Sequence, residues 1–177
     1  SNNEQMNIRK KLMARPYVPN SPVKGDEFEV YRESSSKLYL PRYFGISLYG
    51  KPKESKLPSP VDINLTFTGE LRDYQTKIVG AFIEKAPDGG GLLEIPCGRG
   101  KTVMALKILA ELKVKTLVIV HKGFLLNQWI ERIEQFLPGA RVGRIQGQVM
   151  DIENKDIVIG MLQSLSMKDY PDSMFES

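Results

Sequence analysis

The five residues from Gly98 to Thr102, Gly-Arg-Gly-Lys-Thr, constrain the fold of this chain more than any other stretch. Residues 90–95 before them read as a buried strand, and residues 103–112 after them carry apolar side chains at i, i+3 and i+4 spacing. The pattern predicts a strand, a tight glycine turn and a helix. A strand that leads into a helix through a short turn is typical of α/β proteins with a parallel sheet.

This run also has the chemistry that a phosphate-binding loop needs. Gly98 and Gly100 let the backbone turn its N–H groups toward phosphate oxygens, and the helix N-terminus adds a partial positive charge. Lys101 can reach the β- and γ-phosphates of a nucleotide, and the Thr102 hydroxyl can coordinate magnesium. The longer phosphate-loop pattern has a further glycine where Ile95 stands here, so the alternative at this point is a glycine turn that only caps a helix.

Composition limits the class of protein. The 177 residues are 41% hydrophobic and 26% charged, as in a soluble globular protein, and no apolar run is long enough to span a membrane. The single cysteine, Cys97, excludes a disulfide framework and fits a reducing compartment. We therefore expect an intracellular protein, cytoplasmic or nuclear and in the host cell if viral, with no membrane partner.

The first 60 residues differ from the rest of the chain. They carry 11 Lys and Arg against 6 Asp and Glu, whereas residues 61–177 carry 14 against 15. Residues 27–33 and 37–40 alternate polar and apolar like strands, with a serine run between them as the turn. We predict that residues 1–60 form a small β-rich N-terminal appendage, which ends in a linker of prolines and lysines at residues 51–60.

Aromatic and basic residues interleave in this appendage. They could stack on the bases and grip the phosphates of a nucleic acid. Alternatively, the aromatic rings could pack the appendage against its neighbour. The sequence leaves both interpretations open for Tyr31, Arg32, Tyr39, Arg42, Tyr43 and Phe44.

Apolar runs alternate with helical patterns from residue 61 onward. Strands are predicted over residues 115–120, 142–145 and 155–160, and helices from residue 71, over 124–136 and from 162. The run 115–120 is almost continuously apolar, which is typical of a strand buried on both faces. Trp129 has the helical spacing of a core residue, and we assign it to packing. The predicted fold is a parallel α/β sheet with flanking helices, in which ligands bind at the carboxyl ends of the strands.

Four segments in this order resemble the first RecA-like domain of superfamily 2 helicases and translocases. The likeness is strongest to the excision-repair and transcription helicases and to related helicases of large DNA viruses. Residues 71–75, Leu-Arg-Asp-Tyr-Gln, are similar to the segment whose glutamine reads adenine, and residues 96–102 are similar to helicase motif I, which often lacks the leading glycine. Residues 117–129 and 156–165 resemble two later motifs whose loops meet the nucleic-acid strand.

The resemblance, which covers about residues 67–167, implies a RecA-like P-loop sheet, ATP and Mg²⁺ as cofactors, and nucleic acid as the partner. Duplex DNA is the form it favours, and transcription or repair proteins are further partners it implies. Lys101 and Thr102 would be catalytic, with Thr102 also the metal contact. The nucleotide would be held by Arg72, Gln75, Pro96, Cys97, Gly98, Arg99, Gly100, Lys101 and Thr102. The nucleic acid would be contacted by His121, Lys122, Gly160, Met161 and Gln163.

Phosphoryl transfer also needs an acidic residue after an apolar strand to hold magnesium. The only Asp-Glu pair, at residues 26–27, precedes the loop, and Asp156 precedes its strand. We therefore expect residues 61–177 to be an incomplete first RecA-like ATP-binding domain, without motif II and everything after it. The chain would be the N-terminal part of an ATP-dependent DNA helicase or translocase and inactive alone. The alternatives are a non-enzymatic nucleic-acid-binding module with a retained P-loop and another P-loop phosphotransferase.

Overall fold

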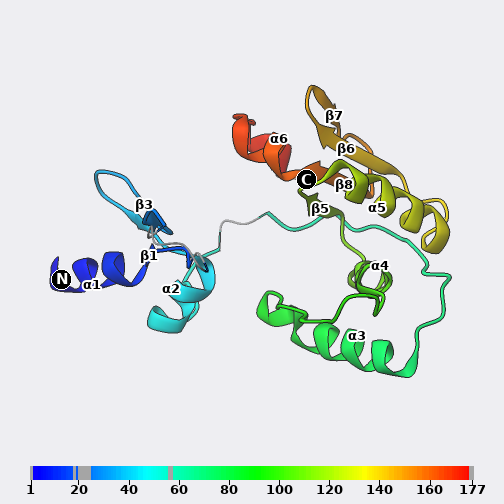
Figure 1. The fold of residues 1–177 in the computed structure, drawn as a ribbon, viewed down its shortest axis with the longest axis horizontal. Helices are drawn as coiled ribbons and strands as arrows, with labels where there is room; N and C mark the ends of the chain where they lie inside the picture. The colour runs from blue at the N-terminus through cyan, green and yellow to red at the C-terminus, as the bar shows by residue number, and fades with distance from the viewer. Residues whose placement is uncertain (1, 18, 20–24, 56–57, 176–177) are drawn as a thin grey trace. The chain divides into compact units, whose positions relative to one another are not determined.

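The computed structural model describes residues 2–17, 19, 25–55 and 58–175. The chain divides into two compact units, Ser1–Lys56 and Leu57–Ser177 (Figure 1). Residues 56 and 57, inside the predicted linker, lie outside the described residues. No helix of the described part is long and apolar enough to cross a membrane.

The N-terminal unit is a mixed α/β structure around a small core. Its elements are α1 (Asn2–Lys11), β1 (Met13–Ala14), β2 (Phe28–Glu29), β3 (Arg32–Glu33), β4 (Leu38–Tyr39) and α2 (Arg42–Tyr49). β1 pairs with β2 and β3 pairs with β4, both antiparallel. The predicted serine turn is confirmed, because the Ser34 N–H donates to the Lys37 carbonyl at 2.9 Å. The core is built from Ile8, Leu12 and Tyr31, with Leu38, Leu40 and Phe44 packed against it.

The prediction that this unit is β-rich is wrong, because the unit contains two helices beside its short strands. Each strand is only two residues long, and residues 42–49, inside the appendage predicted to be β-rich, form the helix α2. Pro41 precedes the first turn of α2, where a missing N–H costs nothing, and Gly50 ends the helix with a φ of +78°. Residues 2–11 form the helix α1, and its Ile8 is buried in the core.

The second unit has the predicted parallel sheet. Its helices are α3 (Asp73–Lys85), η1 (Ala86–Asp88), α4 (Lys101–Leu112), α5 (Gly123–Phe136), α6 (Leu162–Met167) and η2 (Asp172–Phe175). Its strands are β5 (Thr116–Val120), β6 (Val142–Gln146), β7 (Val149–Asp151) and β8 (Ile157–Met161). The strand order is β5-β8-β6-β7, in which β5 and β6 run parallel to β8 and only β7 is antiparallel.

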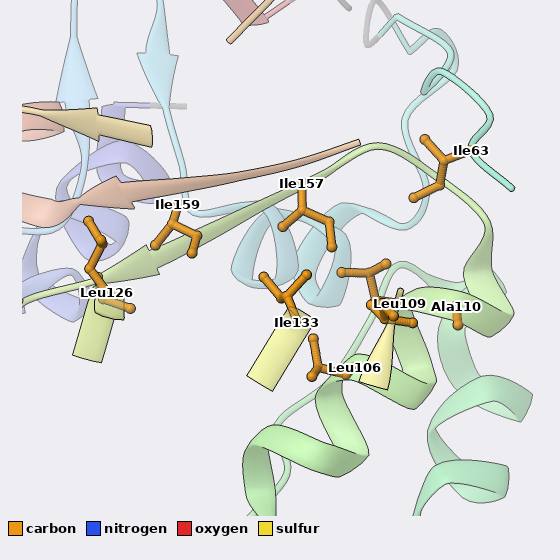
Figure 2. Packing of buried hydrophobic residues seen from close by; sticks show 10 residues of the cluster. Ile63, Leu106, Leu109, Ala110, Leu126, Ile133, Ile157 and Ile159 are labelled. Atoms are coloured by element: carbon orange, nitrogen blue, oxygen red, sulfur yellow. The ribbon is translucent and has the colours of Figure 1, made fainter. Parts of the chain in front are cut away.

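The main core lies between this sheet and helices α4 and α5. Ile157 and Ile159 of β8 face Leu126 and Ile133 of α5, and Leu106 of α4 joins them (Figure 2). These five side chains are at most 2% exposed, and burying each contributes roughly 1.5–3 kcal/mol. The predicted packing role of Trp129 is confirmed, since it lies against this cluster.

Two strand predictions are corrected. The strand predicted at residues 90–95 is absent: these residues have no assigned helix or strand and belong to none of the described sheets. Leu92 is 92% exposed there, while Leu93 and Ile95 pack against a second cluster from α3 and α4. β5 is covered on one face only: its Leu117 and Ile119 are 40% and 55% exposed.

Candidate nucleotide and nucleic-acid site

The glycine turn before α4 has the conformation that a phosphate loop needs. Gly98 and Gly100 have φ values of +76° and +78°, in the left-handed region that glycine tolerates best. Gly100 is the N-cap of α4, so the turn ends at the positive end of a helix dipole. A Cβ on Gly98 would meet no atom within 4 Å, so the backbone there is open to a ligand. The turn therefore fits a polyphosphate.

Lys101 is the first residue of α4 and folds back over the loop. Its ammonium donates to the Ile95 carbonyl at 3.1 Å and to the Pro96 carbonyl at 3.2 Å. These bonds join the helix N-terminus to the start of the turn. Phosphate oxygens are stronger acceptors for an ammonium than neutral carbonyls, so a nucleotide could take this amine from the loop. Thr102 follows in the same helical turn, half-buried, where its hydroxyl could serve a metal on the phosphates.

Gln75 joins helix α3 to the same loop. The side chain is only 5% exposed, and both ends of its amide are used. The Oε1 atom accepts from the Arg72 N–H at 2.9 Å, and the Nε2 atom donates to the Arg99 carbonyl at 3.1 Å. A Cβ on Gly100 would lie 2.5 Å from this Nε2, so the loop and Gln75 pack closely. Gln75 is therefore a structural contact of the phosphate loop, and its reading of adenine stays a prediction.

Tyr74 is a loop contact that the sequence interpretation missed. Its hydroxyl donates to the Arg99 carbonyl at 3.1 Å, and the Arg99 guanidinium lies 5.8 Å from the centre of the Tyr74 ring. One loop carbonyl thus accepts from two neighbouring side chains of α3. The available signal was the aromatic residue directly before Gln75 in the Leu-Arg-Asp-Tyr-Gln segment. Cys97 is exposed in the loop. Arg72, the N-cap residue of α3, is also exposed.

The predicted nucleic-acid residues gather at the carboxyl edge of the sheet. Val120 and Met161 end β5 and β8 and are register partners, so the residues that follow them emerge together. The Gln163 amide donates to the His121 carbonyl at 3.0 Å and ties the two loops to each other. His121, Lys122 and Gln163 are exposed, and Met161 is half-buried. Among these residues, Lys122 is the one that carries a positive charge at neutral pH.

Gly160 differs from the other residues of that set because it is buried. It is buried inside β8, and a Cβ there would lie 2.7 Å from the Leu165 side chain. A glycine at this position lets α6 approach the sheet, which is a packing role, and its contact with a nucleic-acid strand stays a prediction.

Helix α6 also holds the turn between β6 and β7. The Gly147 N–H donates to the Ser164 hydroxyl at 2.9 Å, and the Tyr170 hydroxyl donates to the Ser164 carbonyl at 3.0 Å. The Lys168 ammonium donates to the Gly147 carbonyl. These hydrogen bonds and the one between Gln163 and His121 connect the loops that follow β5, β6 and β8 at the carboxyl edge of the sheet.

Asp156 lies at the opposite end of the sheet. It is 6% exposed and accepts from the Arg141 backbone N–H at 2.8 Å and from its guanidinium at 2.6 and 3.1 Å. The hydrogen bonds from Arg141 hold the pKa of this carboxyl below its ordinary value. Asp156 therefore stabilises the amino ends of β6 and β8 and lies at the far end of these strands from their carboxyl edge, as its place before the strand predicted.

Comparison with known proteins decides the family. Residues 68–175 match the family described as ResIII, the type III restriction enzyme res subunit. The chain belongs to the ResIII family. The match includes the phosphate loop, its α3 contacts and the carboxyl edge of the sheet. With the helicase relatives below, it identifies the second unit as a superfamily 2 helicase RecA-like domain, as the resemblance implied.

Two relatives are similar to this ResIII chain in sequence. A protein of Acanthamoeba polyphaga mimivirus, with the provisional name ATP-dependent RNA helicase L396, is 35% identical over 164 residues, or 90% of this chain and 31% of that protein. The DNA 3'-5' translocase XPB2 of Sulfurisphaera tokodaii is 35% identical over 117 residues, or 63% of this chain and 25% of the translocase. The ResIII chain thus spans less than a third of the length of either relative.

A solved structure shares the fold. The Sulfolobus solfataricus SWI2/SNF2 ATPase core in complex with dsDNA superposes with a TM-score of 0.52 at 23% identity, over 65% of this chain and 25% of that one. This likeness confirms the predicted α/β RecA-like architecture of the second unit.

Proposed function

We propose that this ResIII chain is the N-terminal part of an ATP-dependent DNA helicase or translocase, in which it binds Mg-ATP and contacts the nucleic-acid backbone. The observation that carries the proposal is the phosphate loop, where two left-handed glycines, a helix N-terminus and Lys101 meet. The helicase and translocase names of the relatives support it.

In this proposal the loop residues bind and orient the nucleotide. Lys101 exchanges the carbonyls of Ile95 and Pro96 for phosphate oxygens, while the loop N–H groups and the start of α4 hold the remaining negative charge. Thr102 would hold Mg²⁺, which when bound neutralises charge on the β- and γ-phosphates. Gln75 and Tyr74 keep the Arg99 carbonyl turned toward α3 and so fix the shape of the loop.

The carboxyl edge of the sheet would contact the nucleic acid. Lys122 neutralises a phosphate, and Gln163 positions the loop of His121 and Lys122 through the His121 carbonyl. Such contacts read the backbone and not the bases, which suits a motor that moves along any sequence. The same lysine chemistry fits DNA and RNA. Our preference for duplex DNA rests on the sequence likeness to repair helicases and on the name of the XPB2 relative, a DNA translocase.

We also propose that these 177 residues bind ATP but hydrolyse it negligibly by themselves. In the described sheet, the residues that follow β5, β6 and β8 are His121, Gly147 and Leu162, and none is a carboxylate that could hold magnesium. An intracellular location, cytoplasmic or nuclear, and transcription or repair proteins as partners belong to the same proposal.

The test is titration calorimetry of the chain with Mg-ATP. Lys101→Ala should weaken binding roughly ten- to a hundredfold, since a hydrogen bond to a charged group is lost. Lys107→Ala removes the same charge from the other side of α4, where Lys107 pairs with Glu111 at 2.6 Å, and should leave the affinity unchanged. Equal affinity of the Lys101 variant and the wild type would reject the phosphate-loop assignment. Steady hydrolysis that Lys101→Ala abolishes would reject the proposed inactivity.

A further inference from the structure

The N-terminal unit has a shallow groove of about 300 Å³ beside the β3–β4 hairpin. We propose that this groove binds single-stranded nucleic acid, with one base stacked on Tyr39 and a phosphate held by Arg32. The inference rests on the proposed function for the class of its partner. It adds a second contact surface, on a unit that lies outside the span matched by the ResIII family.

The hairpin register places the two side chains together. Arg32 is opposite Tyr39 in the antiparallel pair, and directly opposed residues project from the same face. The neighbouring pair, Glu33 and Leu38, projects from the other face, where Leu38 packs on the core and Glu33 meets Arg9 of α1. Arg32 and Tyr39 therefore point away from the core. Tyr39 is 54% exposed, whereas Tyr31 of the same unit is buried in the core.

The structure separates the two interpretations of the aromatic residues in this unit. Tyr31 is 7% exposed and Phe44 packs on the same core, so both serve packing. Tyr39 does not belong to that core and forms a wall of the groove. The exposed Val30 and the half-buried Pro41 line the groove with it, so a flat apolar ring could lie against them.

Charge in this unit favours a polyanion. Residues 1–56 carry 11 Lys and Arg against 6 Asp and Glu. Three of the carboxylates are held inside the unit: Glu33 accepts from Arg9, Glu27 from Arg15 and Glu4 from Tyr49. The groove itself includes Glu29, whose Oε1 accepts from the Tyr31 hydroxyl at 3.1 Å. The cationic side chains of Arg32, Lys37 and Arg42 have no carboxylate partner among the described residues and stay exposed.

Stacking on Tyr39 requires a base whose face is free, which a duplex does not offer. An aromatic residue that stacks on a base in a single strand typically changes affinity by roughly ten- to a hundredfold when truncated. DNA and RNA single strands both present such faces. The similarity to the mimivirus relative covers 90% of this chain, so it extends into the N-terminal unit.

The experiment measures fluorescence anisotropy of the 177-residue chain with labelled oligo(dT), oligo(rU), a duplex, and an abasic strand of equal length. The wild type should bind oligo(dT) more tightly than the abasic strand, which has the phosphates but no bases. Tyr39→Ala should weaken oligo(dT) binding roughly tenfold and remove that preference. Tyr39→Phe keeps the ring and should retain it. Tyr17→Ala is the matched control, because Tyr17 is 88% exposed but does not line the groove.

Lys122→Gln separates this inference from the proposed function. It should weaken binding to every strand and leave the preference for bases intact. If the wild type binds equally to oligo(dT) and the abasic strand, but Lys122→Gln weakens both, the groove proposal fails and the proposed function stands. If the wild type binds no strand, both fail. A Tyr39→Ala variant that binds normally but unfolds at a lower temperature would show that Tyr39 packs against protein and would overturn the inference.

Discussion

Gly100→Ala tests the contact between the phosphate loop and helix α3. The φ of +78° at this residue is in the left-handed region, where an alanine costs about 1–2 kcal/mol. The added Cβ would also lie 2.5 Å from Gln75 Nε2. That amide is the end of a flexible side chain and can move, but it then loses its bonds to Arg72 and Arg99.

The expected loss of stability follows from both effects. Leaving the buried Gln75 amide without partners costs about 1–3 kcal/mol, so the two contributions together reach about 2–5 kcal/mol. Such a loss is a large part of the total stability of a domain. Urea unfolding monitored by circular dichroism measures it. Gly91→Ala is the control, since its added Cβ meets no atom within 4 Å and its φ is not left-handed.

A double-variant cycle isolates the contact with Gln75. In a Gln75→Ala background no amide remains to be displaced, so Gly100→Ala should cost only the backbone contribution of about 1–2 kcal/mol. A Gly100→Ala cost that is the same in both backgrounds would refute the close packing of loop and glutamine. A cost below about 0.5 kcal/mol in the wild-type background would refute the left-handed turn as well.

Two further predictions concern the ends of the sheet. Because the pKa of Asp156 is lowered in the folded state, its contribution to stability is present above its unfolded value, near pH 4, and is lost as pH falls through the folded value. Asp156→Asn should cost about 1.5–3 kcal/mol at neutral pH and flatten the acid side of the stability curve; an unchanged acid slope in unfolding titrations would contradict this. At the other end, Gln163→Leu should weaken nucleic-acid binding without changing its salt dependence, since the side chain positions the His121 carbonyl. Lys122→Gln should reduce the slope of log K against log salt by about one, and equal slopes for all three proteins would exclude Lys122 as a phosphate contact.

Local patterns were enough to predict most of the second unit. Helices α3, α4 and α5 have apolar stripes and clear ends, and the residue order Gly-x-Gly-Lys-Thr fixed the loop before α4. The hairpin of β6 and β7 was not predicted, although Gly147, with a φ of +56°, is a turn signal between residues 146 and 149. For this hairpin, the glycine at position 147 is a turn signal that can be read from the sequence alone.

Other features depend on residues that are far apart in the chain. The strand predicted at residues 90–95 needs a neighbouring strand, and apolar composition does not say whether one lies beside it. The bond between Gln75 and Arg99 joins residues 24 positions apart, and no spacing rule reveals it. The helix at residues 42–49 was not predicted for a different reason. Its aromatic content favours a strand, while Pro41 and Gly50 favour a short helix between them.

The bonds from Lys101 to the carbonyls of Ile95 and Pro96 make the lysine an internal competitor of any ligand of the loop. A phosphate that binds must break both bonds, which lowers its net affinity, and when it leaves they form again without help from solvent. An internal competitor weakens binding because it stabilises the unliganded loop relative to the liganded one. The loop is therefore suited to repeated exchange of its ligand and not to permanent storage of it.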